Sequence, residues 1–460
     1  MRILLANPPW KKSAHLYGVR AGSRWPFTMR ADGPKSLTYL PFPFFLAQAA
    51  ALLERQGGAE VKALDAIAEG LTNEEYEAEV VAFAPDLVLA ETAAASFAQD
   101  ARHARRTREL LPKALLAWAG PQVTIHPETA LADNGCVDFC LIGEYEWTLA
   151  EMVQGLLSGS FAPEKVRGLA WRGENGAIRA NARRDLGRLD DLPWPSWGHF
   201  PMLKYRDPFC GVPEPMVNML ASRGCPHRCD FCLWPETMYG GNVYRVRDPQ
   251  DVAEEMATVV GRYGFKTVYF DDDTFNLGKA RVLSLAQAIG DKDLGVHLAV
   301  MARADGMDEE TLDALRAAGL FAVKYGIESG SQSVVDACGK GLDLETARRM
   351  VAYTKKIGVR VHLTFTLGLK GETAETMRQT LDLALELSPD SLQLSFATPF
   401  PGTRFHAWAK DKGYLLATDH ELYDGGQGCV VRTKELTGTE IEAGAEAFRQ
   451  AWKAFREVRG

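Results

Sequence analysis

The stretch Ser222-Arg223-Gly224-Cys225-Pro226-His227-Arg228-Cys229-Asp230-Phe231-Cys232 places three cysteines at the spacing C-x3-C-x2-C, directly after a predicted strand. Iron–sulfur clusters are normally held by cysteine thiolates, usually four of them. Three thiolates on one tight loop reach three corners of a cube-shaped cluster and leave the fourth iron open, which suits chemistry at a metal. The stretch therefore predicts a [4Fe–4S] cluster held by Cys225, Cys229 and Cys232.

A zinc site is the main alternative for these cysteines. Structural zinc usually takes four protein ligands, with a pair of cysteines at both ends of the site. No second pair lies nearby, because Cys210 is isolated and His227 is poorly placed inside the loop to be a fourth ligand. Cysteines with only a packing role would not need this spacing, so the pattern favours the iron–sulfur cluster.

The chain on either side of the cysteine loop alternates short apolar strands with helices. The predicted strands are Val217–Ser222, Thr267–Phe270, His297–Met301, Phe321–Tyr325, Arg360–Phe365 and Ser391–Phe396. Asp248 and Pro249 form a helix start, and Asp343 caps a helix that ends at Gly358. Six such units over residues 216–410 predict a partial, open (βα)6 version of the eight-unit TIM-type barrel.

The first 155 residues show the same alternation with a second set of strands. These are Arg2–Ala6, Glu60–Leu64, Leu87–Glu91, Leu115–Ala119 and Phe139–Ile142. A helix over residues 44–56 ends at Gly57-Gly58. The pattern predicts an α/β, doubly wound, flavodoxin-like domain, whose loops after the strands share the edge where such folds bind ligands. Taken alone, the glycines and prolines of these loops indicate only tight turns.

A connector is predicted over residues 156–215. It contains a small hairpin, Arg167–Arg172 with Ala177–Asn181, around the turn Gly173-Glu174-Asn175-Gly176. The Asp- and Pro-rich stretch Leu189–Trp197 then predicts an extended crossing segment.

The last segment, residues 411–460, is predicted to lie on the substrate side of the barrel. One helix there carries an apolar stripe that indicates core packing: Ile441, Ala445, Phe448, Trp452 and Phe455. Tyr239, Tyr244 and Trp408 are candidate pocket residues, although core packing is the simpler role for each.

Composition narrows the class of protein. The 460 residues suggest two or three domains, and the formal net charge of −8 gives nucleic-acid binding no electrostatic support. No run approaches the ~20 apolar residues that a membrane span needs. The apolar run at the N-terminus is too short for a signal peptide. We therefore expect a cytoplasmic protein whose eight cysteines are reduced thiols or ligands.

The cysteine spacing, with Phe231 before the last cysteine, resembles the radical S-adenosylmethionine (SAM) superfamily. The resemblance implies that the amino and carboxylate groups of SAM chelate the open iron. The reduced cluster then passes an electron to the sulfonium, and a 5′-deoxyadenosyl radical forms and abstracts hydrogen. The resemblance also implies an external electron donor of the flavodoxin or ferredoxin type.

Further matches to this superfamily follow in barrel order. They lie in Phe270-Asp271-Asp272-Asp273-Thr274-Phe275, in Tyr325-Gly326-Ile327-Glu328-Ser329-Gly330, and in Leu367-Gly368-Leu369-Lys370-Gly371-Glu372-Thr373. The positions that the resemblance assigns to SAM binding are Phe231, Asp272, Asp273, Arg303, Glu328, Ser329, Gly368 and Gly371. Four of these positions have structural alternatives. The aspartates suit a helix start, Arg303 suits a surface ion pair, and Gly371 suits a helix capped by Thr373.

The N-terminal half resembles the cobalamin-binding domain of cobalamin-dependent radical SAM enzymes. The matching positions are Asn7, Pro8, Thr92, Ser96, Phe97, Gly120, Pro121, Val123, Gly143, Glu144 and Glu146. The Asp-x-His-x-x-Gly motif that supplies a lower histidine ligand is absent; Asp65-Ala66-Ile67-Ala68-Glu69-Gly70 lacks the histidine. The resemblance therefore implies base-off cobalamin without a protein imidazole.

Methylation of an unactivated carbon in a small molecule is the activity that the resemblance implies first. One SAM would methylate cob(I)alamin, and a second SAM at the cluster would activate the substrate. Ring formation, rearrangement or oxidation is the alternative, since the anaerobic porphyrin-ring cyclases share these features. A zinc- or cobalamin-binding sensor is the alternative outside the enzymes, but a sensor needs no glycine-rich loop or Glu328-Ser329 beside the cysteines.

Overall fold

The computed structural model describes residues 1–173, 175–426 and 428–459, and it divides into two compact units. The first unit comprises Met1–Asp207 and Leu233–Gly241. The second comprises Pro208–Cys232 and Asn242–Gly460. The short segment Leu233–Gly241 therefore belongs to the first unit by its packing, although it begins at the residue after Cys232.

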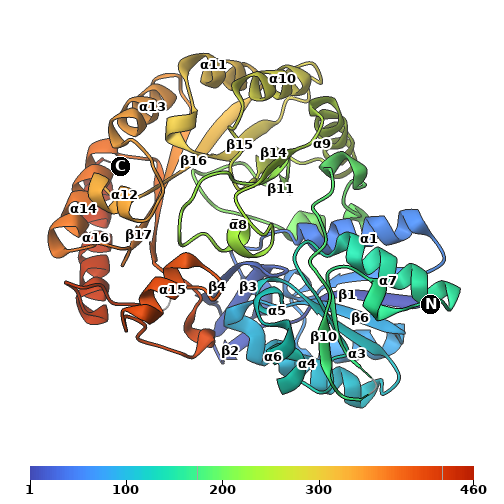
Figure 1. Ribbon diagram of the computed structural model, residues 1–460. Coiled ribbons are helices and arrows are strands. Elements are labelled where there is room, and N and C mark those ends of the chain that lie inside the picture. Colours follow the sequence, from blue (N-terminus) through green and yellow to red (C-terminus); the bar gives the residue numbers. More distant parts are fainter. Residues whose placement is uncertain (174, 427, 460) are drawn as a thin grey trace. The chain divides into compact units, whose positions relative to one another are not determined.

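A seven-stranded sheet forms the centre of the first unit (Figure 1), in the order β10-β9-β8-β7-β6-β1-β5. Its parallel strands are β1 (Arg2–Asn7), β5 (Glu60–Asp65), β6 (Leu87–Glu91), β7 (Leu115–Ala119) and β8 (Phe139–Leu141). Taken in sequence, they have the spatial order 2-1-3-4-5 of a flavodoxin-like fold, which confirms the predicted class.

The helices of the first unit cover both faces of this sheet. Helices α1 (Phe44–Gln56) and α7 (Glu146–Ser158) pack together on one side, and α3 (Asn73–Phe83) and α4 (Phe97–Leu110) lie on the other (Figure 1). Burial on both faces explains why the strands are almost continuously apolar, as in Ile3, Leu4 and Leu5 of β1, which are fully buried.

The expected hairpin in the connector extends the first sheet. Its strands are β9 (Leu169–Arg172) and β10 (Ile178–Ala180), and β9 pairs antiparallel with β8. Within the predicted turn, Glu174 lies outside the described residues. Strands β9 and β10 thus lie in the first unit.

A three-stranded antiparallel sheet that the sequence did not predict fills the connection between β1 and α1. Its strands are β2 (Lys11–Ser13), β3 (Leu16–Ala21) and β4 (Arg24–Arg30). Connections between a strand and the next helix usually take two to six residues. This insertion is much longer, and the structure places it at the edge where ligands bind in such folds.

A six-stranded parallel sheet forms the second unit, in the order β11-β14-β15-β16-β17-β18. The strands are β11 (Met216–Met219), β14 (Thr267–Phe270), β15 (His297–Ala302), β16 (Leu320–Glu328), β17 (Arg360–Leu367) and β18 (Ser391–Phe396). This arrangement confirms the open (βα)6 half-barrel. The predicted first strand is shorter than expected, because Ser222–Gly224 forms a separate strand β12 that pairs with β13 (Tyr244–Val246).

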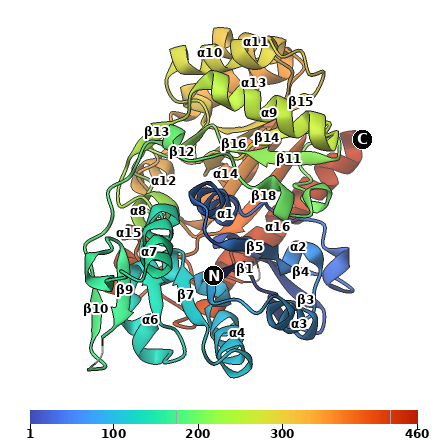
Figure 2. The ribbon, with the colours of Figure 1, turned by 90° about the vertical axis from the view of Figure 1, so that its right-hand side faces the viewer.

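Helices line the outer face of the half-barrel, each packed beside the next (Figure 2). They are α9 (Pro249–Tyr263), α10 (Lys279–Gly290), α11 (Glu309–Ala317), α13 (Leu344–Lys356), α14 (Ala374–Leu387) and α16 (Gly438–Arg459). Asp248 and Asp343 cap α9 and α13 as predicted. On α16, Ile441, Ala445 and Phe448 are buried, which confirms core packing for that part of the stripe.

Among the described residues, no helix combines the length and the apolar composition that crossing a membrane requires.

Candidate functional site

The cysteine loop leaves β12 through Gly224, whose backbone needs the absence of a side chain. Its φ is +93°, and a Cβ there would collide with the carbonyl oxygen of Val243. The Gly224 N–H donates to Asp273 Oδ2 at 2.8 Å. The start of the loop is therefore fixed from two sides before the first cysteine.

The three thiols of this loop lie close enough to influence one another. Cys225 is buried, and Cys229 and Cys232 are half-buried. Burial raises the pKa of Cys229, and the negative charge of Cys225 raises it further. Burial also raises the pKa of Cys232, to which both other thiolates contribute. Three thiolates in such a place need positive charge between them, which the irons of a cubane cluster supply.

A single metal ion would need its ligands to converge on one point. Within the described ranges, no three His, Cys, Asp or Glu side chains do so. The thiolates of a cubane cluster bind three different irons, so that convergence is not required of them. The donor set fits a [4Fe–4S] cluster, and the zinc alternative gains no support.

Three further segments of the second unit contact the back of the loop. The Asp230 N–H donates to the Cys338 carbonyl at 2.9 Å, and the Asp230 carbonyl accepts from the Phe405 N–H at 2.8 Å. The Asp230 side chain forms an ion pair with Lys370. Gly339, at φ +72°, allows its backbone to approach the Arg228 carbonyl so closely that no Cβ would fit. The loop after α12 (Gln332–Ala337) is thus its main support.

The aspartates after β14 hold the approach to the cysteine loop. Asp272 is fully buried, accepts from the Ala221 N–H at 3.2 Å, and is hydrogen-bonded to the Ser222 hydroxyl. Burial raises the pKa of Asp272 to about 6. Next to Asp273, Thr274 donates to the Cys225 sulfur at 3.2 Å. The described contacts of both aspartates are structural, so SAM contact stays a prediction for them.

A buried ion pair lies beside the cluster loop. Glu328 ends β16 with φ at +72°, a conformation rare for a non-glycine residue and often found at functional sites. Its Oε1 is 2.9 Å from Lys340 Nζ, and its Oε2 accepts from Thr366 at 2.8 Å. Burial lowers the pKa of Lys340, but the charges of Glu328 and Cys229 raise it overall. This group therefore combines a fixed cation and a fixed carboxylate.

Lys340 was missed in the sequence. Its only local signal is its position between Gly339 and Gly341, which is no recognised cation site. The structure identifies Lys340 through its pairing with Glu328, whereas Glu328 itself had been found from its motif.

The other predicted SAM residues occupy the same end of the half-barrel strands. Arg303 follows β15, is 6% exposed, and pairs at 2.7 Å with Asp305, which is half-buried. Ser329 is buried and contacts Thr380. The Gly368 N–H donates to Glu372 at 2.6 Å, and Gly371 has φ at +78°. Phe231 packs against an apolar cluster that includes Leu369.

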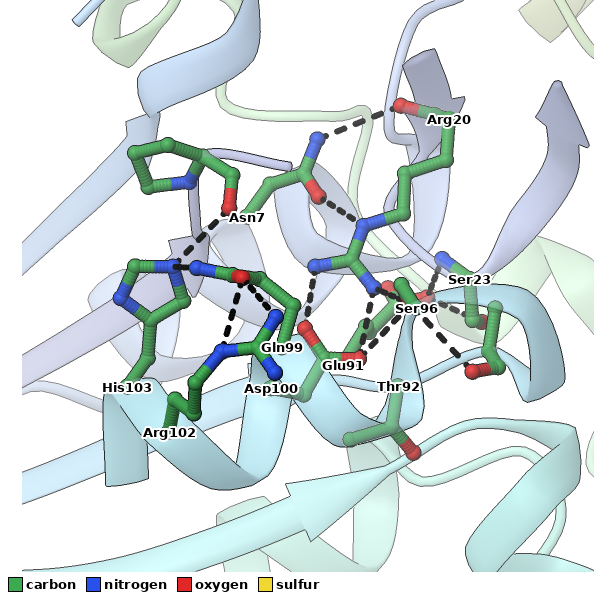
Figure 3. A network of polar contacts seen from close by, with 12 residues as sticks. Asn7, Arg20, Ser23, Glu91, Thr92, Ser96, Gln99, Asp100, Arg102 and His103 are labelled. Atoms are coloured by element: carbon green, nitrogen blue, oxygen red, sulfur yellow. Dashed lines mark hydrogen bonds and ion pairs between the residues drawn. The ribbon is translucent and has the colours of Figure 1, made fainter. Parts of the chain in front are cut away.

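A buried polar network occupies the ligand edge of the first unit (Figure 3). Arg20, from the inserted β3, donates two hydrogen bonds to Asp100 at 2.8 and 2.9 Å, and both side chains are at most 1% exposed. Arg20 also donates to the Asn7 side chain at 3.0 Å and to the Ser96 hydroxyl. Ser23 donates its N–H to Glu91 at 2.6 Å.

This network changes the roles of three predicted cobalamin residues. The side chains of Asn7, Thr92 and Ser96 are at most 1% exposed, and each is hydrogen-bonded within the protein. Gly120, after β7, would collide with the Thr92 carbonyl and Ser23 if it carried a Cβ. Asn7 and Ser96 therefore bond to Arg20 of the inserted β3, whereas Thr92 donates to the Ala119 carbonyl of β7.

The loop after β7 and the chain after β10 each place one buried polar atom at this edge. Gln122 Oε1 and Arg183 Nε are buried, and neither has a hydrogen-bond partner among the described residues. The Arg183 guanidinium lies against Gly143, where a Cβ would be 2.6 Å from Nη2. An acceptor and a donor at one edge suit the peripheral primary amides of cobalamin. The edge fits that cofactor at the loops after β7 and β8, and neither residue had been predicted.

The remaining predicted cobalamin residues surround these loops. Pro8, Pro121, Val123, Gly143 and Glu146 are buried, and Phe97 and Glu144 are half-buried. The Phe97 ring packs edge-on against Trp118 at 5.2 Å. Of the candidate pocket residues, Tyr239 is buried, and Trp408 stacks on Phe405 at 5.4 Å.

Comparison with known proteins gives consistent matches. Residues 219–384 match the model of the radical SAM superfamily. An uncharacterized methyltransferase of Pyrococcus horikoshii is 31% identical over 415 residues, which cover 90% of this chain and 87% of the relative. Cytidylyl-2-hydroxyethylphosphonate methyltransferase of Streptomyces wedmorensis is 28% identical, with 90% and 87% covered.

Two further proteins resemble the chain over most of its length. The anaerobic magnesium-protoporphyrin IX monomethyl ester cyclase of Rubrivivax gelatinosus is 25% identical, over 92% of this chain and 72% of the relative. Among solved structures, the radical SAM methyltransferase TsrM of Kitasatospora setae, with cobalamin and a [4Fe–4S] cluster bound, superposes with a TM-score of 0.68. The two are 18% identical, with 89% of this chain and 75% of TsrM covered. This likeness shows the same fold.

Proposed function

Because the chain belongs to the radical SAM family of its Pyrococcus horikoshii relative, we propose that it is a cobalamin-dependent enzyme that transfers a methyl group from SAM to an unactivated carbon of a small molecule. The observation that carries the proposal is the set of three thiols on one fixed loop of the second unit, in a chain whose first unit has a flavodoxin-like fold. The two methyltransferases among its relatives favour methylation.

We assign the cluster and SAM to the half-barrel, residues 216–410. Cys225, Cys229 and Cys232 hold the cluster, which when reduced supplies the electron for cleavage of SAM. Lys340 would hold the carboxylate of SAM, because a buried ammonium binds an anion strongly where water is excluded. Glu328 fixes Lys340 by their 2.9 Å contact, and Arg303 adds a second buried cation.

We assign cobalamin to the first unit, residues 1–155, with help from Arg183. When bound, cobalamin supplies the carrier that passes the methyl group on. Gln122 would accept from one of its amides, and Arg183 Nε would donate to another, because both are buried without partners among the described residues. The loops Gly120–Val123 and Gly143–Glu146 would contact the cofactor through their backbones. Residues 411–460 would shape the substrate pocket.

The proposed chemistry needs an external one-electron donor, and we propose one of the flavodoxin or ferredoxin type. We also propose a cytoplasmic location, since a reducing compartment preserves both the thiols and the cluster.

The test is an anaerobic reaction of the enzyme loaded with iron, sulfide and hydroxocobalamin. The reaction contains a low-potential one-electron reductant such as dithionite, SAM with a trideuterated methyl group, and the metabolite extract of a strain that lacks the enzyme. We expect S-adenosylhomocysteine, 5′-deoxyadenosine and a metabolite that has gained the label. Formation of 5′-deoxyadenosine without S-adenosylhomocysteine or a labelled metabolite would contradict methyl transfer.

Ring formation or oxidation is a second candidate, favoured by the likeness to the magnesium-protoporphyrin cyclase. The same reaction distinguishes it, because such a product keeps the carbon count of the substrate and carries no deuterium.

A further inference from the structure

Arg183 links two parts of the first unit that the proposed function places next to different cofactors. It lies in the extended chain after β10, and its Nη2 donates to the carbonyl oxygens of Thr237 and Met238. These carbonyls end helix α8 (Leu233–Thr237), where backbone acceptors lack helical partners. A guanidinium at this position both satisfies them and suits the negative end of the helix.

The same guanidinium fills the space beside two glycines. A Cβ on Gly143, in the loop after β8, would lie 2.6 Å from Nη2. A Cβ on Gly240, just after α8, would lie 2.9 Å from Nη1. Both residues have positive φ, 76° and 69°. Arg183 is therefore held between the loop that we assign to cobalamin and the segment Leu233–Gly241.

Other contacts tie this segment to the first unit. The Trp234 ring lies 4.8 Å from Phe45 of α1, and the Arg24 guanidinium lies 5.3 Å from the same ring. Thr124, after β7, contacts the Met238 sulfur at 3.7 Å. The segment Leu233–Gly241 thus packs as part of the first unit. The peptide bond before Leu233 connects it to Cys232, the third thiolate of the cysteine loop.

From these contacts we propose that Arg183 is a positioning residue. It holds the end of α8 at a fixed position against the Gly143 loop. Because Leu233 follows Cys232 directly, this contact also fixes the position of the third ligand of the cluster. The inference rests on the proposed function and adds a route by which the state of the cobalamin edge reaches the cluster. The positioning effect comes from the Nη groups of Arg183, which contact protein atoms, so it does not require either cofactor to contact these groups.

The test uses the full enzyme loaded anaerobically with iron, sulfide and hydroxocobalamin. The variants are Arg183→Ala and Arg183→Lys. We measure iron per chain, the electron paramagnetic resonance spectrum of the reduced cluster with and without SAM, and the Kd of SAM from its titration. For Arg183→Ala we expect near-normal iron, a shifted spectrum, and a Kd raised about tenfold, the usual scale for residues behind a metal ligand. Arg183→Lys should shift the spectrum less than Arg183→Ala does and should raise the Kd of SAM less.

A glycine pair provides the matched control and protects against misfolding of Arg183→Ala. Gly240→Ala introduces the collision with Arg183, whereas Gly159→Ala has nearly the same φ, 68° against 69°, and no atom within 4 Å. We expect Gly240→Ala to reproduce the spectral shift and Gly159→Ala to leave the spectrum unchanged. In the Arg183→Ala background, Gly240→Ala should add nothing.

The outcomes separate the two proposals. If the wild-type enzyme shows no SAM-responsive cluster, the proposed function fails. If the wild type responds to SAM but Arg183→Ala and Gly240→Ala match it in spectrum and within twofold in Kd, the positioning role alone is refuted.

Discussion

Replacing Asp100 by asparagine removes one partner of the buried ion pair that anchors the inserted β3 to the sheet edge. Arg20 and Asp100 are 0% and 1% exposed, and two hydrogen bonds of 2.8 and 2.9 Å join them. Breaking a buried pair on one side leaves an uncompensated charge, which costs about 3–5 kcal/mol of unfolding free energy. For a unit of about 200 residues, this loss lowers the melting temperature by about 6–20 °C.

The assay is thermal unfolding of the full chain, followed by circular dichroism, for Asp100→Asn, Arg20→Met and the double variant Arg20→Met/Asp100→Leu. Because the double variant removes both charges of the pair, it should lose less stability than either single variant. Glu109→Gln breaks an exposed pair with Arg106 on the same helix and should leave the melting temperature unchanged. A double variant that loses as much as the sum of the single variants would refute the reasoning.

Three further predictions concern the second unit. Gly339→Ala should abolish iron loading, because its Cβ would collide with the Arg228 carbonyl under the cluster loop. Gly341→Ala, with positive φ and no atom within 4 Å, should retain iron in a colorimetric assay. Lys340→Met should raise the Kd of SAM about tenfold or more, since a charge-assisted hydrogen bond contributes about 1.5–3 kcal/mol. The exposed Lys279→Met should not change this Kd, and equal values for the two variants would exclude the role of Lys340. Burial raises the pKa of Glu372 from 4.5 to about 7, so the unfolded carboxyl ionises first and wild-type stability should fall as pH rises between these values. Glu372→Gln should lack this fall. A wild-type melting temperature that changes between pH 5 and pH 8 by the same amount as that of the variant would contradict the prediction.

Local signals in the sequence predicted most of the regular structure. Long apolar strands and acidic helix caps act over a few residues, so β1, β14 and the helix starts at Asp248 and Asp343 were found close to their final bounds. The three cysteines were equally readable, because one loop carries them all.

The features that were missed depend on contacts between distant residues. Strand β3 is held by Arg20 reaching Asp100, eighty positions along the chain, and nothing within β2–β4 announces that contact. Lys340 gains its role only when the chain brings it to Glu328. Arg183 stands in a segment without a motif, and its partners Gly143 and Gly240 lie on opposite sides of it in the sequence. Such roles follow from tertiary packing, which no local pattern encodes.

The assignment of Asn7, Thr92 and Ser96 shows a related limit. The resemblance placed these residues at the ligand edge of the sheet, but it could not show that Arg20 of the inserted β3 would bond to Asn7 and Ser96 there. Thr92 is bonded instead to the Ala119 carbonyl of β7, and all three side chains are hydrogen-bonded within the protein. The polar atoms without described partners lie instead on Gln122 and Arg183.

The most direct measurement is electron paramagnetic resonance of the anaerobically reconstituted, reduced protein, with iron and sulfide determined on the same sample. The account predicts four irons and four sulfides per cluster. It also predicts an electron paramagnetic resonance spectrum that changes when SAM is added. Replacing Cys229 by alanine should abolish this spectrum and its response to SAM. A spectrum that does not change when SAM is added, or one that is the same in the Cys229→Ala protein, would contradict a cluster held by three thiolates with one iron open.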